Sequence, residues 1–372
     1  MVMHRWDEVL FAQSTSNAPI KNTASAEYRE GLYPAFSATG QDVWLPTHRY
    51  EGRGIVVSAV GARCGKSFKA DGKWNVVANT HALYVNEDIA LRDYCWYALN
   101  NEEWWIKAGS GQPFVKLKDS LKRKHCFPPI EEQKQIVKVL DEVAQLISLR
   151  KEQLAKLDQL VKSRFIELFG DMLLNDMAWQ ESTLDTLSDV VSGITKGRKI
   201  RETELIEVPY MAVSNVKDGY IDWTTVKTIL ATKQEIEQYR LLPYDVLMTE
   251  GGDPDKLGRG AVITKPLENS IHQNHIFRVR LQAEKILPVY FSEYLQHQKA
   301  KRYFLRCAKQ TTGIASINMK QLRALPVLVP PLELQEQFAA FVEQTDKSKL
   351  AIQQSLDKLE LLKKSLMQEY FG

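Results

Sequence analysis

A glycine-rich segment with a lysine and a serine, residues 61–67 (GARCGKS), has residue types that could bind a phosphate. The phosphate-binding loop of nucleotide hydrolases has the pattern G-x-x-x-x-G-K-[ST] and leads into a helix whose N-terminus faces the phosphates. Here only three residues separate Gly61 from Gly65, and an Asp71-Gly72 pair with a β-branched run follows. This pattern predicts a hairpin and a strand instead of a helix. We therefore do not expect an ATP site in this segment.

Other residues with catalytic or metal-binding chemistry are spread along the chain. The seven histidines show no metal-ligand spacing, and the four cysteines form no C-x-x-C pair. Asp253-Pro254-Asp255 could supply half of a nuclease metal site, but no Glu-x-Lys partner follows closely, and Asp-Pro between glycines indicates a turn. The Asn/Asp-Pro-Pro-aromatic loop of DNA amino-methyltransferases and the Rossmann glycine spacing are also missing. The sequence predicts no catalytic site, no metal site and no cofactor of its own.

The composition is that of a soluble globular protein, with 44% hydrophobic and 26% charged residues in a chain of 372. This length allows two domains. No apolar run approaches membrane-spanning length, and the first ten residues lack a signal-peptide core. Cysteines this far apart are expected to be reduced thiols. These features predict a cytoplasmic protein that does not contact a membrane.

An internal repeat dominates the organisation of the chain. Residues 128–170 and 330–372 align without a gap at an offset of 202, and 14 of their 43 positions are identical. Each copy begins with Pro-Pro and ends on Phe-Gly, with no other Gly or Pro between, which are start and stop signals of a helix. Apolar residues recur with a period of 3.5 from Ile136 and from Phe338. This period favours a coiled coil over two separate amphipathic helices.

The order globule, helix, globule, helix requires the two helices to be antiparallel if they pair. At 1.5 Å per residue each helix would be about 57 Å long, which suits a spacer between globules on neighbouring turns of DNA, each about 34–36 Å. The sequence therefore predicts an α+β (mixed α/β) fold with a pseudo-twofold internal repeat. Its expected parts are two globular domains at 1–127 and 172–329 and two coiled-coil helices at 128–171 and 330–372.

The two globular parts repeat a second pattern. In each, a hydrophobic strand leads into a glycine-rich basic loop, an Asn-His element, an aromatic-rich helical segment and a small glycine loop. The near-P-loop segment takes the place that GGDPDKLGRG has in the second globule, where no Walker feature exists. We interpret both as surface loops. The matched segments are 54–60 and 245–249 for the strands, 79–81 and 274–275 for the Asn-His elements, 88–105 and 288–308 for the helical segments, and Gly111 and Gly313 for the last loops.

The sequence resembles the DNA specificity subunit of type I restriction-modification systems over essentially its whole length. The resemblance rests on PPIEEQKQIVKVLD…FG and PPLELQEQFAAFVE…FG, supported by VPYMAVSNVKDGYID, YDVLMTEGGDPDKLGRGAV and QNHIFRV in the second globule and by YPAFSATG and GIVVSAVGARCGKS in the first. The family implies two target recognition domains, each reading one half of a split, asymmetric sequence in double-stranded DNA. The antiparallel helices would act as a ruler between the two halves.

The resemblance also implies partners. Two copies of a DNA-methyltransferase modification subunit would dock on the helices and methylate adenine. S-adenosylmethionine, ATP and Mg are then expected on partner subunits alone, including an ATP-dependent motor-nuclease subunit in complexes that restrict DNA. The chain enters its first expected domain almost at once, which differs from the family pattern.

The predicted DNA contacts follow from residue chemistry and from the resemblance. Glycines let backbone N–H groups approach a phosphate, and Lys and Arg neutralise it and reach base edges. Each large globule has a net charge of +3, with 16 basic against 13 acidic residues in 1–127 and 21 against 18 in 172–329. The first globule contributes Arg63, Lys66, Lys69, Lys73, Ser110 and Gln112. The second contributes Lys196, Arg198, Lys199, Asn215, Lys217, Lys256, Arg259, Asn274, His275 and Thr312. Further candidates are Asn79 and His81 in the first globule and Asp253 and Gln273 in the second.

Two other hypotheses stay open on the sequence alone. The chain could be a coiled-coil scaffold whose globules bind proteins, in which case the basic loops are ordinary solvated turns. It could also be a nucleotide hydrolase, a reading that depends on residues 61–67 alone. Salt distinguishes the DNA-binding hypothesis from the scaffold hypothesis. Phosphate-driven DNA binding weakens steeply with salt, whereas a protein scaffold need not bind DNA. A heptad inserted near Gln153 would test the ruler, because it should change the gap between half-sites and leave the half-sites themselves unchanged.

Overall fold

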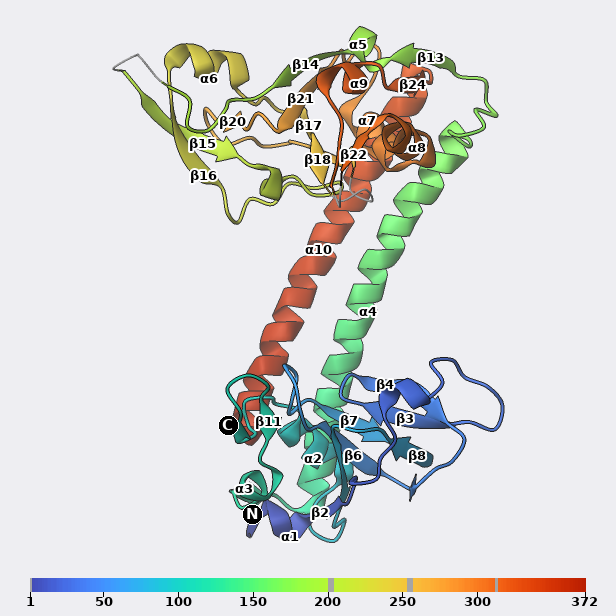
Figure 1. Ribbon diagram of the computed structural model, residues 1–372, viewed down its shortest axis with the longest axis vertical. Coiled ribbons are helices and arrows are strands. Elements are labelled where there is room, and N and C mark those ends of the chain that lie inside the picture. The colour runs from blue at the N-terminus through green and yellow to red at the C-terminus, as the bar shows by residue number, and fades with distance from the viewer. Residues whose placement is uncertain (1, 200–203, 253–256, 312–313) are drawn as a thin grey trace. The chain divides into compact units, whose positions relative to one another are not determined.

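The computed structural model describes residues 2–199, 204–252, 257–311 and 314–372 (Figure 1). The chain divides into two compact units. The first unit consists of Met1–Lys151 and Gln354–Gly372, and the second of Glu152–Gln353. Each unit therefore combines one globular part with portions of both long helices, where the sequence predicted four consecutive parts.

The two long helices are α4, Ile130–Phe169, and α10, Leu332–Phe371, of 40 residues each. Each begins directly after a Pro-Pro pair and ends before a glycine, as the sequence predicts. Within the first unit, the Lys151 ammonium of α4 lies 2.8 Å from the Glu360 carboxylate of α10. Within the second, the Asp158 carboxylate lies 2.7 Å from the Lys349 ammonium. In this same unit the Phe165 ring of α4 lies 5.3 Å from the Phe338 ring of α10, so the two helices run antiparallel there.

The first unit contains two four-stranded sheets and short helices. One sheet has the order β2-β9-β6-β7 and is antiparallel. The other has the order β4-β3-β8-β5, in which β3 and β8 are parallel. The elements are β1 Val2–Arg5, α1 Trp6–Val9, β2 Leu10–Gln13, a 3-10 turn Lys21–Thr23, β3 Tyr33–Ser37, β4 Gly40–Leu45, β5 Tyr50–Glu51, β6 Gly54–Ser58, β7 Ser67–Ala70, β8 Lys73–Val76, β9 Thr80–Val85, α2 Arg92–Leu99, β10 Lys107–Ala108, β11 Phe114–Val115, α3 Leu117–Leu121 and β12 Lys124–Phe127.

The second unit repeats this arrangement. Its sheet β14-β21-β17-β19 corresponds to β2-β9-β6-β7, and β16-β15-β20 again contains one parallel pair, β15 with β20. The elements are β13 Gln180–Thr183, α5 Leu184–Leu187, β14 Ser188–Ser192, β15 Ile206–Met211, a 3-10 turn Val213–Asn215, β16 Lys227–Ala231, α6 Lys233–Tyr239, β17 Val246–Thr249, β18 Gly251–Gly252, β19 Gly260–Val262, β20 Ile271–His272, β21 Ile276–Leu281, α7 Pro288–Gln296, α8 Gln298–Cys307, β22 Lys309–Thr311, β23 Ile314–Ser316, α9 Met319–Arg323 and β24 Pro326–Val329. The predicted mixed α/β fold with an internal repeat is confirmed.

Aromatic side chains attach the helices to each globular part. In the first unit, the ring of Phe371 at the end of α10 lies 5.1 Å from that of Tyr94 on α2. In the second, the ring of Phe169 at the end of α4 lies 4.8 Å from that of Tyr290 on α7. Phe338 of α10 is also fully buried in this second core. The helix ends thus belong to the two hydrophobic cores, and burial of these rings holds them there.

A buried glutamine fixes the start of α4 on the first unit. Gln133 is completely buried. Its side-chain oxygen accepts the Leu91 N–H at 2.8 Å, and its Nε2 donates to the carbonyls of Ile89 at 3.1 Å and Pro128 at 2.8 Å. The amide therefore connects the helix start to the residues that precede α2.

Gln335 does the same at the start of α10 in the second unit. Its oxygen accepts the Leu287 N–H at 2.8 Å, and its Nε2 donates to the carbonyls of Lys285 at 3.2 Å and Pro330 at 2.8 Å. The matching partners place Leu91 and Leu287 at equivalent positions of the repeat. The shared Pro-Pro and Gln residues of the repeat are thus structural anchors.

The segment after the near-P-loop forms strands, as predicted, although its pairing differs from the prediction. β7 begins at Ser67, so no helix follows the glycine loop. However, Asp71-Gly72 does not close a hairpin: β7 pairs with β6, and β8 pairs with β3 and β5. The Asp-Gly pair instead connects one sheet to the other. Pairing with strands far away in the chain determines this connection, and local turn chemistry does not. The predicted helical segment 88–105 is helical only over α2, and 288–308 divides into α7 and α8.

A buried histidine in the second unit gives a pH dependence. His272 is completely buried, with Nδ1 3.2 Å from the Tyr239 carbonyl and Nε2 3.3 Å from the Val191 carbonyl. Burial lowers the pKa of its imidazole from 6.5 to about 4, although both carbonyls act to raise it. The folded unit thus favours the neutral ring. Its contribution to stability is full above the unfolded pKa of 6.5 and is lost as the pH falls towards 4.

We expect His272 to account for about 2 kcal/mol of the free energy of unfolding lost between about pH 7 and about pH 5. Denaturant titration at both pH values would measure this loss. In His272→Gln the pH-dependent loss should shrink by that amount. Equal pH dependence in wild type and His272→Gln would contradict the assignment.

Candidate nucleic-acid interface

The loop between β6 and β7 of the first unit, residues 59–66, is closed by backbone hydrogen bonds. The Gly65 N–H donates to the Ser58 carbonyl at 2.8 Å, and the Ser58 N–H donates to the Lys66 carbonyl at 2.9 Å. Gly65 has a φ of +95°, and a Cβ there would lie 2.6 Å from the Trp105 ring. Glycine is required because neither this φ nor this space accepts a side chain. Lys66 therefore follows a glycine whose conformation is fixed.

The β10–β11 turn lies against this loop. The Gly61 N–H donates to the Pro113 carbonyl at 2.9 Å. Gly109 in the turn has a φ of +95°, and its Cβ would lie 2.5 Å from the Gln112 carbonyl oxygen. The two loops thus bring predicted residues together on one side of the unit. These residues are Arg63, Lys66, Ser110 and Gln112.

The second unit has the same loop framework with an arginine in place of the lysine. β17 pairs with β19 as β6 pairs with β7. The Thr249 N–H donates to the Arg259 carbonyl at 3.1 Å, as that of Ser58 does to Lys66. Gly258 precedes the arginine with a φ of +69°, and its Cβ would clash with the Phe304 ring. Lys66 and Arg259 therefore occupy equivalent positions, each after a glycine packed on an aromatic ring.

Several polar atoms at these two loops have unused hydrogen-bonding capacity. Among the described residues, no hydrogen-bond partner exists for the buried hydroxyls of Ser58 and Thr249 or for the buried Nε of Arg259. The Lys66 ammonium lies 5.2 Å from the centre of the Phe68 ring, where it makes a cation–π contact. Arg63 is largely exposed, and its only ion-pair partner in the described chain is Glu102 at 3.7 Å. Arg63 is thus exposed, whereas Lys66 and Arg259 are half-buried.

Other predicted residues lie elsewhere on the two units. Lys73 is exposed at the start of β8, and Lys196 and Lys199 are exposed in the turn after β14. Asn274 and His275 lie just before β21, and the His275 Nδ1 lies 2.5 Å from a Glu250 carboxylate oxygen. Lys217, another predicted DNA contact, is half-buried, and its ammonium lies 4.0 Å from the Asp222 carboxylate.

Lys69 is engaged inside the first unit. Its ammonium lies 3.0 Å from the Asp93 carboxylate and 4.4 Å from the centre of the Trp96 ring. The same ammonium and two nearby arginines lower the pKa of Asp93 against the effect of burial. These contacts favour a structural role, and we leave Lys69 out of the proposed interface.

Arg198 and Asn215 are also engaged in contacts of the second unit. The Arg198 guanidinium forms a bidentate ion pair with Glu235 at 2.5 Å, which raises the pKa of the arginine and lowers that of the glutamate. Asn215 is completely buried, accepts the Ala212 N–H at 2.9 Å and donates to the Asp222 carbonyl at 2.9 Å. A DNA contact by Asn215 would require this turn to open. Both residues are left out of the proposed interface for these reasons.

The sequence pattern matched one pair of residues incorrectly. The Ala59 N–H donates to the Asn79 carbonyl at 2.9 Å, and the Glu250 N–H donates to the His275 carbonyl at 3.0 Å. Asn79 therefore corresponds to His275. His81 lies inside β9, and burial lowers the pKa of its imidazole. Only the backbone hydrogen bonds reveal this correspondence, because the sequence pattern aligns Asn79 with Asn274, one residue away.

Three predicted residues, Asp253, Lys256 and Thr312, lie outside the described residues. Over the part of the chain that the structure describes, no group of three or more His, Cys, Asp or Glu side chains is placed to hold a metal ion. In the same residues, no helix is both long and apolar enough to cross a bilayer. The four cysteines are unpaired.

Comparison with known families tests the resemblance that the sequence indicates. The family of the type I restriction modification DNA specificity domain matches residues 47–159 and 177–362, which is most of the chain. The chain belongs to this family. The resemblance that the repeated helices and loops indicate is therefore confirmed. One matched region contains Lys66 and the other contains Arg259.

Individual relatives are similar over part of their length. The putative type I restriction enzyme MjaX specificity subunit of Methanocaldococcus jannaschii is 29% identical over 50% of this chain and 44% of its own. The type I restriction enzyme EcoKI specificity subunit of Escherichia coli K12 is 23% identical over 59% of this chain and 49% of its own. The chain thus spans about half the length of the curated relatives it matches.

The fold is similar to solved S subunits. The type I restriction-modification system S subunit from M. genitalium matches with a TM-score of 0.62 at 16% identity, covering 100% of this chain and 96% of that one. A second structure, described under complex assembly and conformational transition of the type I R-M system, matches with a TM-score of 0.57 at 14% identity, covering 100% of this chain and 97% of that one. At such identities the similarity concerns the fold.

Proposed function

We propose that this chain is the non-catalytic, sequence-specific DNA-binding subunit of a type I restriction-modification complex. Each unit reads one half of a bipartite, asymmetric site in double-stranded DNA. The observation that carries the proposal is the repeated loop framework, which presents Lys66 in one unit and Arg259 in the other at equivalent positions after a fixed glycine. Two similar units with different loop residues suit a site whose halves differ in sequence.

The chemistry of the loops supports DNA as the ligand. Lys and Arg neutralise phosphates, and an Arg can donate two hydrogen bonds to a guanine edge. The Arg259 Nε has no partner in the described residues, so a ligand could accept its hydrogen bond. Ser110 and Gln112 add exposed polar groups beside Lys66. The exposed Lys73, Lys196 and Lys199 are proposed as phosphate contacts, and Asn274 and His275 as contacts near bases.

The partners are part of the same proposal. Two copies of a methyltransferase modification subunit dock on α4 and α10, and S-adenosylmethionine is bound by those subunits. An ATP-dependent restriction subunit joins complexes that cleave DNA. The family match and the similarity to a structure described under type I complex assembly support these partners.

A methylome tests the proposal directly. This chain would be co-expressed with its host's modification subunit in a strain without adenine methylation, and N6-methyladenine would be mapped by single-molecule sequencing. A single bipartite motif that disappears without this chain is the expected result. Complex formation without new methylation would favour the protein scaffold instead. Binding of the purified complex to the motif should also weaken log-linearly between about 50 and about 200 mM salt.

The helices are proposed to set the gap between the half-sites, and a matched insertion tests this. One heptad would be added to α4 after Lys151 and one to α10 after Gln353, so that the antiparallel pairing keeps its register. Each heptad lengthens a helix by about 10.5 Å, the rise of about three base pairs. We expect the mapped gap to lengthen by about that number while both half-sites stay the same. A changed half-site with an unchanged gap would refute the ruler.

A further inference from the structure

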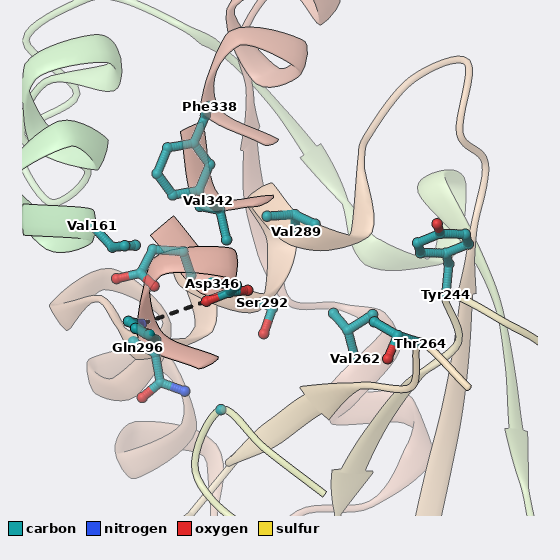
Figure 2. Close-up of a pocket in the computed structure, with 13 residues that line it drawn as sticks. Val161, Tyr244, Val262, Thr264, Val289, Ser292, Gln296, Phe338, Val342 and Asp346 are labelled. Carbon is teal, nitrogen blue, oxygen red and sulfur yellow. Dashed lines mark ion pairs between the residues drawn. The ribbon is translucent and has the colours of Figure 1, made fainter. Parts of the chain in front are cut away.

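A cavity of about 260 Å³ lies in the second unit between α7, the end of β19, the turn at Gly219 and the first part of α10. It is far larger than the ~30 Å³ that one water molecule takes up in the liquid. Figure 2 shows Ser292 and Asp346 among its lining residues, with Phe338 and Val342 above them and Val262 at the lower right. Glu293 of α7 and Lys349 of α10 complete its charged lining.

At the equivalent position of the first unit, the repeat places larger side chains. Leu91 and Leu287 bond to equivalent glutamines, so α2 and α7 align with Trp96 opposite Ser292 and Tyr97 opposite Glu293. The strand registers Ile55↔Lys69 and Val246↔Val262 likewise make Val262 the counterpart of Lys69. Two aromatic rings and a lysine in one unit are therefore replaced in the other by three smaller side chains.

In the first unit the side chains of Trp96, Tyr97 and Lys69 all have contact partners. The Tyr97 hydroxyl donates to the Asp141 carboxylate of α4 at 2.6 Å, and the Trp96 Nε1 donates to the Ser67 carbonyl at 3.1 Å. Lys69 makes cation–π contacts with both rings, at 4.4 and 5.3 Å from their centres. All three side chains are therefore held by contacts within the first unit.

In the second unit the cavity leaves a negative charge without a partner. No described residue forms an ion pair or a hydrogen bond with the Glu293 carboxylate. Burial raises the pKa of this carboxyl, and the nearby Asp218 charge raises it further. Three lysines, Lys162, Lys349 and Lys301, act to lower it. Lys349 is already held by Asp158 at 2.7 Å and by Asp346 at 3.6 Å. Lys349, the lysine that lines the cavity, is thus engaged by other carboxylates, and Glu293 has no ion-pair partner among the described residues.

We propose that this cavity receives a basic side chain, Arg or Lys, of the methyltransferase modification subunit. This inference rests on the proposed function. Charge complementarity selects the occupant, because a carboxylate without a partner in a partly buried site is stabilised by a cation and repels a DNA phosphate. One wall of the cavity is α10, on which that subunit is proposed to dock. Since Trp96, Tyr97 and Lys69 occupy the equivalent positions of the first unit, the two modification subunits dock through chemically different contacts.

Glu293→Gln tests the proposal, because it removes the charge and keeps the shape. Native mass spectrometry and titration of the full chain with the purified modification subunit would measure both occupancies. We expect one of the two binding steps to weaken about tenfold, so that complexes with one modification subunit accumulate. Ser292→Trp, which introduces the residue found in the first unit, should act in the same direction by filling the cavity. The control Glu237→Gln removes an exposed charge of α6 and should leave both steps unchanged.

The outcomes separate this proposal from the proposed function. Glu293→Gln should unfold at the same denaturant concentration as wild type or a higher one, so weaker docking could not be ascribed to misfolding. Two unchanged binding steps in Glu293→Gln would overturn the cavity proposal while leaving the function intact. Loss of a dimer of this chain, instead of loss of a modification subunit, would also overturn it. Failure of the wild-type chain to bind any modification subunit would refute the proposed function itself.

Discussion

Replacing both Lys66 and Arg259 by Ala is expected to weaken specific DNA binding about 10³-fold. Each cation follows a glycine that is fixed by a positive φ and by contact with an aromatic ring. Removing a side chain that contacts a base edge costs about 1–3 kcal/mol, which is about 10- to 100-fold in affinity. The two residues belong to separate compact units. Their effects should therefore add.

The two single variants should differ in which half of the site they affect. Lys66→Ala should reduce discrimination at one half-site and Arg259→Ala at the other, because each unit carries one of the loops. Fluorescence anisotropy with duplexes that contain the mapped motif, or one scrambled half of it, would measure this. Scrambling one half-site should lower the affinity of a variant only slightly when that variant no longer reads this half-site.

Matched controls remove the same charge elsewhere. Lys118 of α3 and Lys320 of α9 are exposed and occupy equivalent positions at the repeat offset of 202. Their Ala variants should lower affinity slightly and equally for all duplexes, as loss of general positive charge does. If Lys66→Ala and Arg259→Ala behave like these controls, the two loops do not read DNA.

The parts of the fold that depend on periodic patterns could be predicted from the sequence. The heptads and the Pro-Pro and Phe-Gly signals located α4 and α10 to within two residues at each end. The β-branched run after Gly72 also predicted strands where a phosphate-binding loop would lead into a helix, and β7 and β8 are strands. These features are local or periodic, so a single sequence contains them.

Contacts between distant residues could not be predicted. The pairing of β7 and β8 with different sheets depends on strands far away in the chain. Lys69 looked like a loop cation, yet Asp93 and Trp96 hold it inside the unit. Asn215 was expected to contact DNA from the family resemblance, although it is buried and hydrogen-bonded within its turn. Residue type indicates what a side chain can do, and only packing decides whether it is available.

Replacing either buried glutamine by Ala is expected to lower the free energy of unfolding by about 4 kcal/mol. In Gln335→Ala, the Leu287 N–H and the carbonyls of Lys285 and Pro330 lose their partner. Each buried polar group left without a hydrogen bond costs about 1–3 kcal/mol. Water that enters the small space left by the side chain offsets part of the sum. Gln133→Ala should cost a similar amount, since Gln133 has equivalent partners.

Exposed glutamines two residues further along each helix are the matched controls. Gln135 and Gln337 are also identical between the two copies of the repeat, and both are exposed. Gln135→Ala and Gln337→Ala should change the free energy of unfolding by no more than about 0.5 kcal/mol. Denaturant titration of all four variants would measure the difference. Equal stability of the buried and exposed variants would show that the glutamines do not anchor the helices.

The glutamine variants also distinguish support of the fold from recognition of DNA. At low temperature, where Gln335→Ala remains folded, its loops keep Arg259 in place, so affinity for the mapped motif should stay within about threefold of wild type. Arg259→Ala should show the opposite result, with unchanged stability and weakened binding. Both residues belong to the second unit and both have counterparts in the first. Only a repeat that uses Gln133 and Gln335 to hold its helices, and Lys66 and Arg259 to contact the ligand, gives this reciprocal result in both units.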